Sequence, residues 1–323
     1  MNRMKNQSGR KGFAVALLLM GGVVLLCGCC KRKLDHGTLR GYVEIALDWS
    51  GTAAAPSGSE LWFYPQDGSQ PFKYNCKADV FRGELPKGTY RIIVHNTDAE
   101  EVSYRGMNSY STAEVYANKK TEPEPEEYRV KAGSPTSISE PRQVYGDGQC
   151  AAGQTFEVGY RDTLNTTVSP VALTRTVSFR FDVTNMANIA SVDGYLEGVA
   201  GGVYLSTGKR TYGHSCSTAF TTTEVSGTGG TSYLTQIRVF GLSSQDEGKN
   251  GSNTACVRLT REDGTVHETL VDISDAIRRV IDDNGGEIPL AIPVRIELTL
   301  IGTHLTAAVV SWDESGSGGG VVE

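Results

Sequence analysis

From Leu39 onward, apolar and polar side chains alternate with a period of two in many short stretches. Because successive side chains of a β-strand point to opposite faces, this alternation is typical of half-buried strands. Turn-forming pairs separate the stretches, among them Asp67-Gly68, Asp147-Gly148 and Asp263-Gly264. Many short strands with such spacing predict an all-β fold of β-sandwiches rather than alternating β-α-β units. The predicted strands cover residues 42–47, 61–64, 90–94, 177–183, 236–240, 256–259, 294–300 and 305–310.

One segment departs from this pattern. Between Ile273 and Ile281, apolar residues fall at positions i, i+3, i+4, i+7 and i+8, which is the single stripe of an amphipathic helix. Asp272 or Ser274 can cap its start, and Asn284-Gly285 can end it. We expect this one short helix to cover an open sheet edge or one end of the second sandwich.

The N-terminus predicts export and a lipid anchor. Four basic residues precede an apolar run from Phe13 to Leu26, which is typical of a secretion signal and too short to span a bilayer. The run ends in Leu26-Cys27-Gly28-Cys29, where a small residue precedes a cysteine and an aliphatic residue stands third before it. This is the lipoprotein pattern, so we expect cleavage after residue 28 and acyl chains of the palmitate type on Cys29. Cys30 fits less well, because Cys29 would then take the small-residue position.

The net charge and the secretion signal argue against two classes of function. Loss of the signal removes four basic and no acidic residues, which changes the net charge from −6 to −10. An acidic exported chain is a poor nucleic-acid binder and is not a cytosolic enzyme. Residues 29–36 form a tether in which Lys31-Arg32-Lys33 suits anionic head groups. The tether lacks an acidic inner-membrane retention signal, which favours the outer membrane.

The remaining cysteines do not define a disulfide framework. Besides Cys29 the mature chain keeps Cys30, Cys76, Cys150, Cys216 and Cys256, an odd number. Cys216 with Cys256, and Cys76 with Cys150, are candidate disulfides that export permits but does not require. The mature chain has no C-x-x-C pair, so a structural zinc site has no support.

Catalytic patterns are weak throughout. The five histidines include no H-E-x-x-H motif, and the chain has no G-x-S-x-G elbow. The stretch from Gly227 to Gly230 lacks a phosphate-binding lysine and predicts a hairpin turn. The carboxylate pairs Glu100-Glu101 and Asp282-Asp283 are better explained as solvated positions than as a glycosidase pair. We therefore expect no catalytic residue, metal, cofactor or small-molecule substrate.

Several tyrosines leave a second interpretation open. A sugar-stacking platform is one use of Tyr104, Tyr110, Tyr145 and Tyr160, although in β-sandwiches tyrosines are more often core or strand-surface residues. Asp162-Thr163-Leu164 matches a short O-glycan acceptor pattern used by Bacteroidetes, which is weak evidence for modification at Thr163.

Ordered motifs resemble one known family. They are Tyr42 to Trp49, Phe63 to Gly68, Leu85 to Tyr90, His95 to Asp98, Val177 to Val183, Asn185 to Asn188, Gly194 to Ala200, Val271 to Ile277 and Val310 to Trp312. In this order and spacing the chain resembles the FimB-like fimbrial anchor lipoproteins of Bacteroidales, relatives of the fimbrillins. The resemblance implies two tandem transthyretin-like, Greek-key β-sandwiches, an outer-membrane lipid on Cys29, and a role in holding or ending a fimbria.

The resulting expectation is a surface lipoprotein that acts as a fimbrial anchor or accessory subunit and is not an enzyme. We place an N-terminal sandwich at residues 37–165, a C-terminal sandwich at 166–312 and a flexible, Gly-rich tail at 313–323. Residues 121–127 are acidic and Pro-broken, which predicts an exposed loop. Fimbrillin-like subunits are the expected partners, bound through β-sheet edges as the family's strand exchange implies. The tail is too Gly-rich for a good donor strand. The alternative is a glycan-binding outer-membrane lipoprotein of a polysaccharide uptake system.

Overall fold

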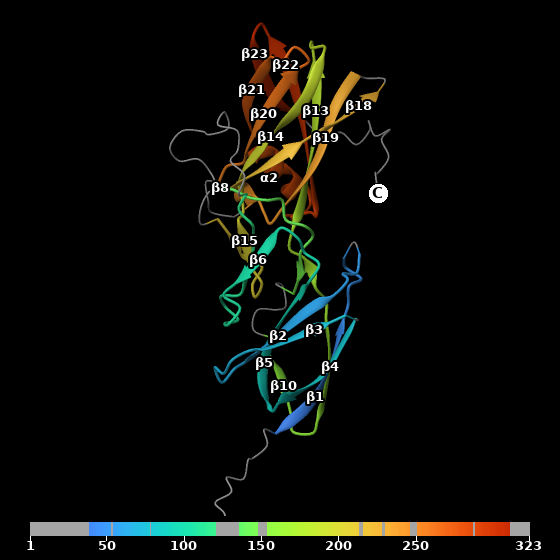
Figure 1. Cartoon of the computed structure of the whole chain (residues 1–323), viewed down its shortest axis with the longest axis vertical. Coiled ribbons are helices and arrows are strands. Elements are labelled where there is room, and N and C mark those ends of the chain that lie inside the picture. Colours follow the sequence, from blue (N-terminus) through green and yellow to red (C-terminus); the bar gives the residue numbers. More distant parts are fainter. Residues whose placement is uncertain are drawn as a thin grey trace, which may run out of the picture.

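The fold was analysed in a computed structural model of the chain. It describes residues 39–52, 54–77, 79–120, 136–147, 154–212, 216–227, 230–245, 251–286 and 288–310. Within these ranges, no helix is both long and apolar enough to cross a membrane. The molecule is elongated, with the strands of the first half at one end and those of the second half at the other (Figure 1).

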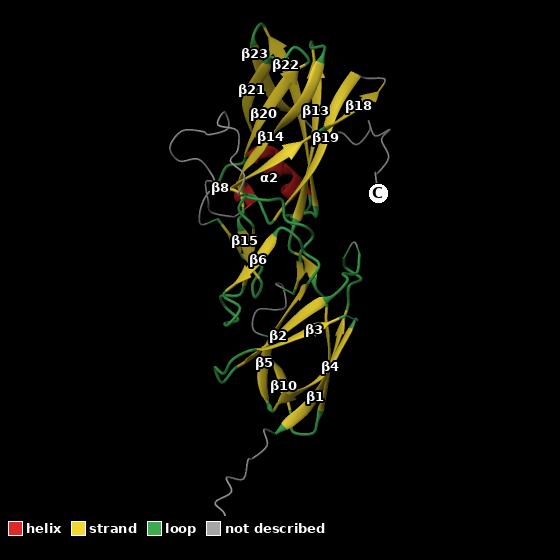
Figure 2. Ribbon diagram, in the orientation of Figure 1, coloured by secondary structure: helices red, strands yellow, loops and turns green. Residues whose placement is uncertain are grey.

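Strands dominate the described residues, and one α-helix interrupts them (Figure 2). The elements are β1 (Arg40–Leu47), β2 (Ser59–Pro65), β3 (Phe72–Cys76), β4 (Val80–Pro86), β5 (Gly88–Asn96), β6 (Val102–Arg105), β7 (Glu114–Ala117), β8 (Thr136–Ser137), β9 (Tyr145–Gly146), β10 (Phe156–Val158), β11 (Thr163–Val168), β12 (Val171–Ala172), β13 (Arg175–Thr184), β14 (Ile189–Val199), β15 (Gly202–Tyr204), β16 (Arg210–Thr211), β17 (Cys216–Thr221), β18 (Thr223–Gly227), β19 (Gly230–Val239), the 3-10 turn η2 (Ser243–Gln245), β20 (Thr254–Arg261), β21 (Val266–Asp272), α2 (Ser274–Asp283), β22 (Ala291–Ile301) and β23 (His304–Val310). The all-β prediction is confirmed.

The first half is a sandwich of two sheets. One sheet has the order β11-β1-β4, and the other has the order β12-β9-β5-β2-β3 with β10 beside β5. Along β1 the side chains of Val43 and Ile45 are buried, while Tyr42 is exposed on the opposite face. Phe63 in β2 reaches across to Phe81 in β4, with ring centroids 5.4 Å apart. The period-two alternation therefore identified the core face of these strands.

The second half is a sandwich of two five-stranded sheets, β18-β19-β13-β22-β23 and β21-β20-β14-β17-β8. Three rings form the centre of its core. Phe220 from β17 stacks on Phe179 and Phe181 from β13, with ring centroids 5.4 and 5.6 Å apart. All three side chains are buried, so the packing joins the two sheets into one core.

The two sandwiches share a connection pattern. In the first, β1 lies between an antiparallel neighbour, β4, and a parallel neighbour, β11. In the second, β13 lies between an antiparallel neighbour, β19, and a parallel neighbour, β22. Parallel neighbours need a crossover between them, which a meander of simple hairpins does not supply. This repeated arrangement fits two tandem sandwiches of one architecture.

A four-stranded sheet joins the halves. Its order is β16-β15-β7-β6. β6 and β7 come from the first half of the chain, and β15 and β16 come from the second half. Its buried Val115 and Val203 belong to the same apolar cluster as Ile93 of β5 and Phe179 of β13. The predicted boundary near Asn165 falls within β11, which pairs with β1. We propose that the chain passes to the second sandwich between β12 and β13.

The helix closes the junction end of the second core. Ile273 and Ile277 are fully buried, and Val280 and Ile281 pack against the same cluster. Neither predicted cap residue is the N-cap: that position is Ile273, which makes no side-chain cap hydrogen bond, while Asp272 Oδ1 accepts a hydrogen bond from the Ser274 backbone N–H at 2.9 Å. Gly285 follows the helix with φ of +71°, a left-handed conformation that favours glycine. The sequence-predicted helix is therefore confirmed.

Candidate functional site

The predicted site residues were all cysteines, and of the cysteines considered in the sequence the structure describes three, one of which is Cys76, buried at the end of β3. Cys29, Cys30 and Cys150 lie outside the described residues. Cys216 lies on β17 and Cys256 on β20, and both are buried thiols whose pKa is raised by burial.

The predicted Cys216–Cys256 disulfide is not formed in this structure. β17 and β20 flank β14 from opposite sides, with Cys216 paired to Val199 and Cys256 paired to Tyr195. Two strand spacings alone separate them by roughly 9–10 Å, and their partners lie four residues apart along β14, whereas a disulfide needs Cα atoms within about 7 Å. The sequence showed that both cysteines were in the same half but not that a strand lies between them.

The four tyrosines considered as a sugar platform do not share an exposed face. Tyr145 is buried beside Trp49, Tyr110 packs edge-on against Tyr64, and Tyr104 stacks on His95. Of the four, Tyr160 is the exposed one, at 45%. In the part of the chain that the structure describes, no three His, Cys, Asp or Glu side chains come together as metal ligands.

Glu60 is the centre of a partly buried cluster of polar and charged side chains in the first sandwich. Its carboxylate lies 2.6 Å from Lys73 Nζ and 3.3 Å from His95 Nε2, and it accepts a hydrogen bond from Trp62 Nε1 at 2.5 Å. Burial alone would raise the pKa of Glu60, but the contacts with His95, Lys73 and Trp62 outweigh it and lower the pKa to about 2. The cluster joins β2, β3 and β5.

The β18 strand offers an open edge. It is the outermost strand of its sheet, next to β19, and its side chains from Thr223 to Ser226 are exposed. Val225 is a large apolar side chain that is 45% exposed there. On the other side of this sandwich, the edge strands β21 and β23 contact each other and close it. The fourth edge strand, β8, has two residues, so among the described residues of the second sandwich β18 is the longest edge left to pair with another strand.

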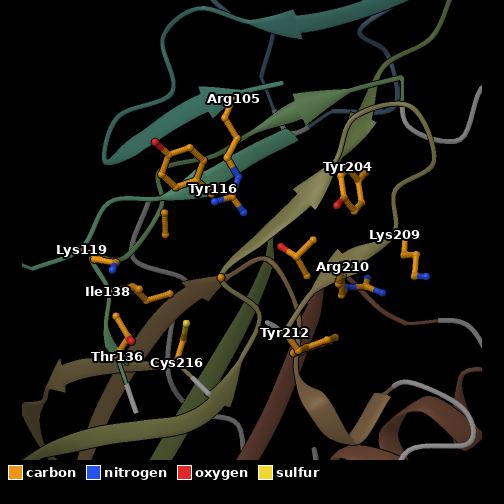
Figure 3. A pocket seen from close by; sticks show the side chains of 13 residues that line it. Arg105, Tyr116, Lys119, Thr136, Ile138, Tyr204, Lys209, Arg210, Tyr212 and Cys216 are labelled. Atoms are coloured by element: carbon orange, nitrogen blue, oxygen red, sulfur yellow. The ribbon is translucent and has the colours of Figure 1, made fainter. Parts of the chain in front are cut away.

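A cavity of about 430 Å³ lies where the joining sheet meets the second sandwich (Figure 3). Residues from both halves of the chain form its walls, because β7 and β8 come from the first half and β15, β16 and β17 from the second. Its lining residues are Arg105, Tyr116, Ala117, Lys119, Thr136, Ile138, Gly201, Tyr204, Lys209, Arg210, Thr211, Tyr212 and Cys216.

One wall of the cavity is held rigidly by a buried carboxylate. Glu114 accepts two hydrogen bonds from Arg105, from Nε at 2.7 Å and from Nη2 at 2.9 Å, and a third from the Thr211 hydroxyl at 2.7 Å. The Arg105 guanidinium also lies over the Tyr116 ring, 4.8 Å from its centroid. On the opposite side, Arg210 Nε donates to the carbonyl of Phe240 at 3.0 Å. These bonds hold the side chains of Arg105, Glu114 and Arg210 in place.

Sequence reasoning did not identify this cavity. The available signal was the Lys209-Arg210 pair flanked by Tyr204 and Tyr212, a basic and aromatic cluster within nine residues. Its counterpart, around Tyr116 on β7, lies far away in the sequence. Only the pairing of β15 with β7 brings the two segments together.

A family model described as "Domain of unknown function (DUF5119)" matches residues 28–220. A protein described as a putative fimbrium anchoring subunit, Fim4B of Bacteroides ovatus, is 39% identical over 113 residues. That alignment covers 33% of this chain and 32% of the relative, so it spans about a third of the relative's length. These matches confirm the resemblance to fimbrial anchor proteins that the sequence motifs predicted.

Solved structures share the fold at low sequence identity. A putative adhesin from Bacteroides ovatus is 18% identical with a TM-score of 0.55, over 85% of this chain and 94% of that chain. A putative adhesin from Bacteroides thetaiotaomicron is 9% identical with a TM-score of 0.56, over 84% and 96%. The fimbrial anchor protein Mfa2 from Porphyromonas gingivalis is 12% identical with a TM-score of 0.50, over 84% and 98%. The β-sandwich architecture is thus shared over most of each chain.

Proposed function

We propose a function for this chain, which belongs to the DUF5119 family: it is a fimbrial anchor or accessory subunit on the bacterial surface. The observation that supports this most directly is the 39% identity to a fimbrium anchoring subunit over 113 residues. The relatives described above are fimbrial and adhesin proteins, which favours a structural role over a catalytic one.

In this proposal the protein is held in the outer membrane by acyl chains on Cys29. The motif Leu26-Cys27-Gly28-Cys29 supports lipidation there. Leu39 directly precedes β1, which lies at the end of the molecule farthest from the second sandwich (Figure 1). A lipid on Cys29, ten residues before Leu39, would put the first sandwich nearer to the membrane than the second. Each buried CH₂ contributes ~0.8 kcal/mol, so more than one chain gives stable anchoring.

The proposed partner surface is the β18 edge of the second sandwich. A fimbrillin-type subunit would add an extended strand there, with backbone hydrogen bonds supplying affinity and alternating side chains setting the register. The exposed Val225 supplies an apolar contact on that edge, and Glu224 beside it disfavours uncontrolled self-pairing. The position of this edge, on the sandwich remote from Leu39, fits a subunit that links a membrane to a fimbria.

Membrane fractionation tests the anchor. We expect Cys29→Ala to release the folded protein from the membrane pellet after a carbonate wash. Cys30→Ala is the matched control, because it removes the neighbouring thiol and leaves the lipoprotein motif intact; it should stay in the pellet. If Cys29→Ala also stays in the pellet, the anchor on Cys29 is wrong.

Extraction from fimbriated cells in mild detergent tests the assembly role. An affinity tag within residues 121–127 captures the protein, and the eluate is run without boiling. We expect a ladder of larger species containing fimbrillin-type chains. Glu224→Pro should abolish the ladder, because the Glu224 N–H points away from β19 and proline has no N–H to offer a partner strand, whereas Glu224→Thr should preserve it. A lone monomer from cells that make fimbriae would contradict the assembly role. A ladder that survives Glu224→Pro in a protein with unchanged thermal unfolding would exclude the β18 edge.

A further inference from the structure

The exposed apolar side chains of the first sandwich gather at one end of it. Among the described residues from 39 to 172, the large apolar side chains that are exposed are Leu39, Tyr42 and Tyr160, at 49%, 58% and 45%. Leu39 and Tyr42 stand at the start of β1, and Tyr160 lies in the loop between β10 and β11. β1 starts at the end of the molecule farthest from the second sandwich (Figure 1). Single exposed apolar residues are common on protein surfaces, but three at one end indicate a contact surface.

Backbone hydrogen bonds tie three segments into this surface. From the loop between β10 and β11, the Arg161 N–H donates to the Arg40 carbonyl at 2.9 Å. From the turn between β4 and β5, the Lys87 N–H donates to the Leu39 carbonyl at 2.6 Å. The surface formed by residues 39–42, 87 and 160–162 is called the tip below.

The tip carries charges of both signs. Arg40, Lys87 and Arg161 are exposed, and none of them forms an ion pair with a described acidic residue. The exposed acidic side chains on the same loop and the adjoining strands are Glu84, Glu157 and Asp162. Because these charges balance, an anionic surface would not repel the tip, although the chain as a whole is acidic.

The tip is also the part of the described fold that the proposed anchor would bring nearest to the membrane, so this inference rests on the proposed function. Cys29 precedes Leu39 by ten residues, and ten residues span at most about 35 Å when fully extended. A surface held this close to a bilayer has a high effective concentration there, so that even a weak contact is populated. A second copy of the chain has no such link to the tip.

We propose that the tip contacts the surface of the lipid bilayer. The rings of Tyr42 and Tyr160 would lie at the level of the head groups, where amphipathic aromatic side chains are favoured. Leu39 would reach the boundary between head groups and acyl chains. Lys87 would lie against the phosphate groups of the lipids. Such a contact sets the orientation of the first sandwich on the membrane, which an acyl chain alone leaves free.

Co-sedimentation with lipid vesicles tests the contact. The protein is the chain from residue 29 onward carrying Cys29→Ala, so no acyl chain contributes, and the vesicles are an equimolar mixture of phosphatidylethanolamine and phosphatidylglycerol. We expect the protein to pellet with the vesicles and to stay in the supernatant without them. A protein that does not bind the vesicles would overturn the proposal. This outcome is separate from the anchor on Cys29, which the carbonate-washed membrane pellet tests.

Two matched pairs of variants locate the binding, with residues 29–38 unchanged in all of them. Leu39→Ser should weaken vesicle binding about fivefold, whereas Leu270→Ser, at a leucine of β21 that is 65% exposed, should change it less than about twofold. Lys87→Gln should weaken binding about fivefold, whereas Lys209→Gln, at an exposed lysine of the second half, should have little effect. Equal thermal unfolding verifies the fold of each variant. Equal losses within either pair would overturn the assignment to the tip.

A second copy of the chain is the competing occupant of the tip. Sedimentation equilibrium of the same protein without vesicles separates the two, and we expect a monomer. A dimer that Leu39→Ser dissociates would assign the tip to self-association and overturn the proposal. As a further readout, Tyr160→Trp should retain vesicle binding and its added tryptophan fluorescence should shift to the blue, because the larger ring also favours the interface. Unshifted fluorescence in the bound protein would place Tyr160 away from the bilayer and overturn the proposal.

Discussion

The buried carboxyl group of Asp147 allows a direct test of how burial of a charge affects the stability of this fold. It follows β9 and is 5% exposed. Its Oδ1 accepts one long hydrogen bond, from the Val94 N–H at 3.4 Å, and its Oδ2 has no partner among the described residues. Burial raises the pKa of this carboxyl to about 7, well above the usual 3.8. We therefore expect Asp147→Asn, which removes the charge and keeps the shape, to stabilise the protein at neutral pH.

The magnitude follows from the shift in pKa. Between pH 3.8 and about 7 the folded protein holds a proton on Asp147 that the unfolded chain has lost. Stability therefore falls by ~1.4 kcal/mol per pH unit across this window and is constant on either side of it. The sum is about 4 kcal/mol, so Asp147→Asn should gain up to that amount at pH 8 and almost nothing at pH 4. In the wild type this contribution is fully present below pH 3.8 and is lost as the pH rises to about 7.

Urea unfolding at pH 4 and pH 8 measures both values. Tryptophan fluorescence is a suitable signal, because Trp49 packs on Tyr145 beside the site, with ring centroids 6.0 Å apart. Asp79→Asn is the control, since it removes the same charge from an exposed position and should change stability by less than about 0.5 kcal/mol. A gain for Asp147→Asn that is equal at the two pH values, or a loss at pH 8, would refute the reasoning.

Two further substitutions test the packing. Glu60→Gln should lower the free energy of unfolding by about 3 kcal/mol at pH 7, because the pKa of Glu60 is lowered from 4.5 to about 2. This cost should shrink as the pH falls from 4.5 towards 2. Acid titration followed by circular dichroism compares the stability of the variant with that of the wild type. Gly194→Ala should cost about 3 kcal/mol or prevent folding, because a Cβ there would overlap the Cys256 carbonyl oxygen in the next strand. Gly51→Ala meets nothing within 4 Å and should be neutral in the same thermal unfolding assay, so equal costs at the two glycines would contradict the packing argument.

The strands, the helix and the turns could be predicted because short-range sequence patterns specify them. Alternation found the strands, and the apolar stripe found the helix that runs from Ser274 to Asp283. The turn pairs were also read correctly at Gly68 and Gly264, which have φ of +79° and +81°. Asp147 shows where this reasoning ends. The Asp-Gly pair at 147–148 predicts an exposed turn, but only the tertiary fold places the carboxyl of Asp147 in an apolar environment.

Long-range pairing could not be predicted from the same patterns. Nothing in the sequence near β8 indicates that it will pair with β17 of the second sandwich, nor that β7 will pair with β15. Such pairings depend on which chain segments the whole fold brings together, and the cost of closing the loop rises only slowly with its length. The cavity was missed for this reason. Each of its two segments was visible as ordinary strand sequence, and the site exists only once they meet.

The position of β1 between two partner strands suits a protein that is held through the segment before β1. Under the proposed anchor, tension reaches the fold at Leu39 and passes into β1, which rises from that end of the molecule (Figure 1). β1 is paired on both sides, with β4 from Arg40 to Ala46 and with β11 from Tyr42 to Leu47. A pull along β1 must therefore strain both ladders together, whereas an edge strand would release its bonds on one side alone. β5 then links the two cores: Ile92 and Val94 pack in one cluster with the buried residues of β1, and Ile93 packs in the cluster that continues through the joining sheet into the second sandwich.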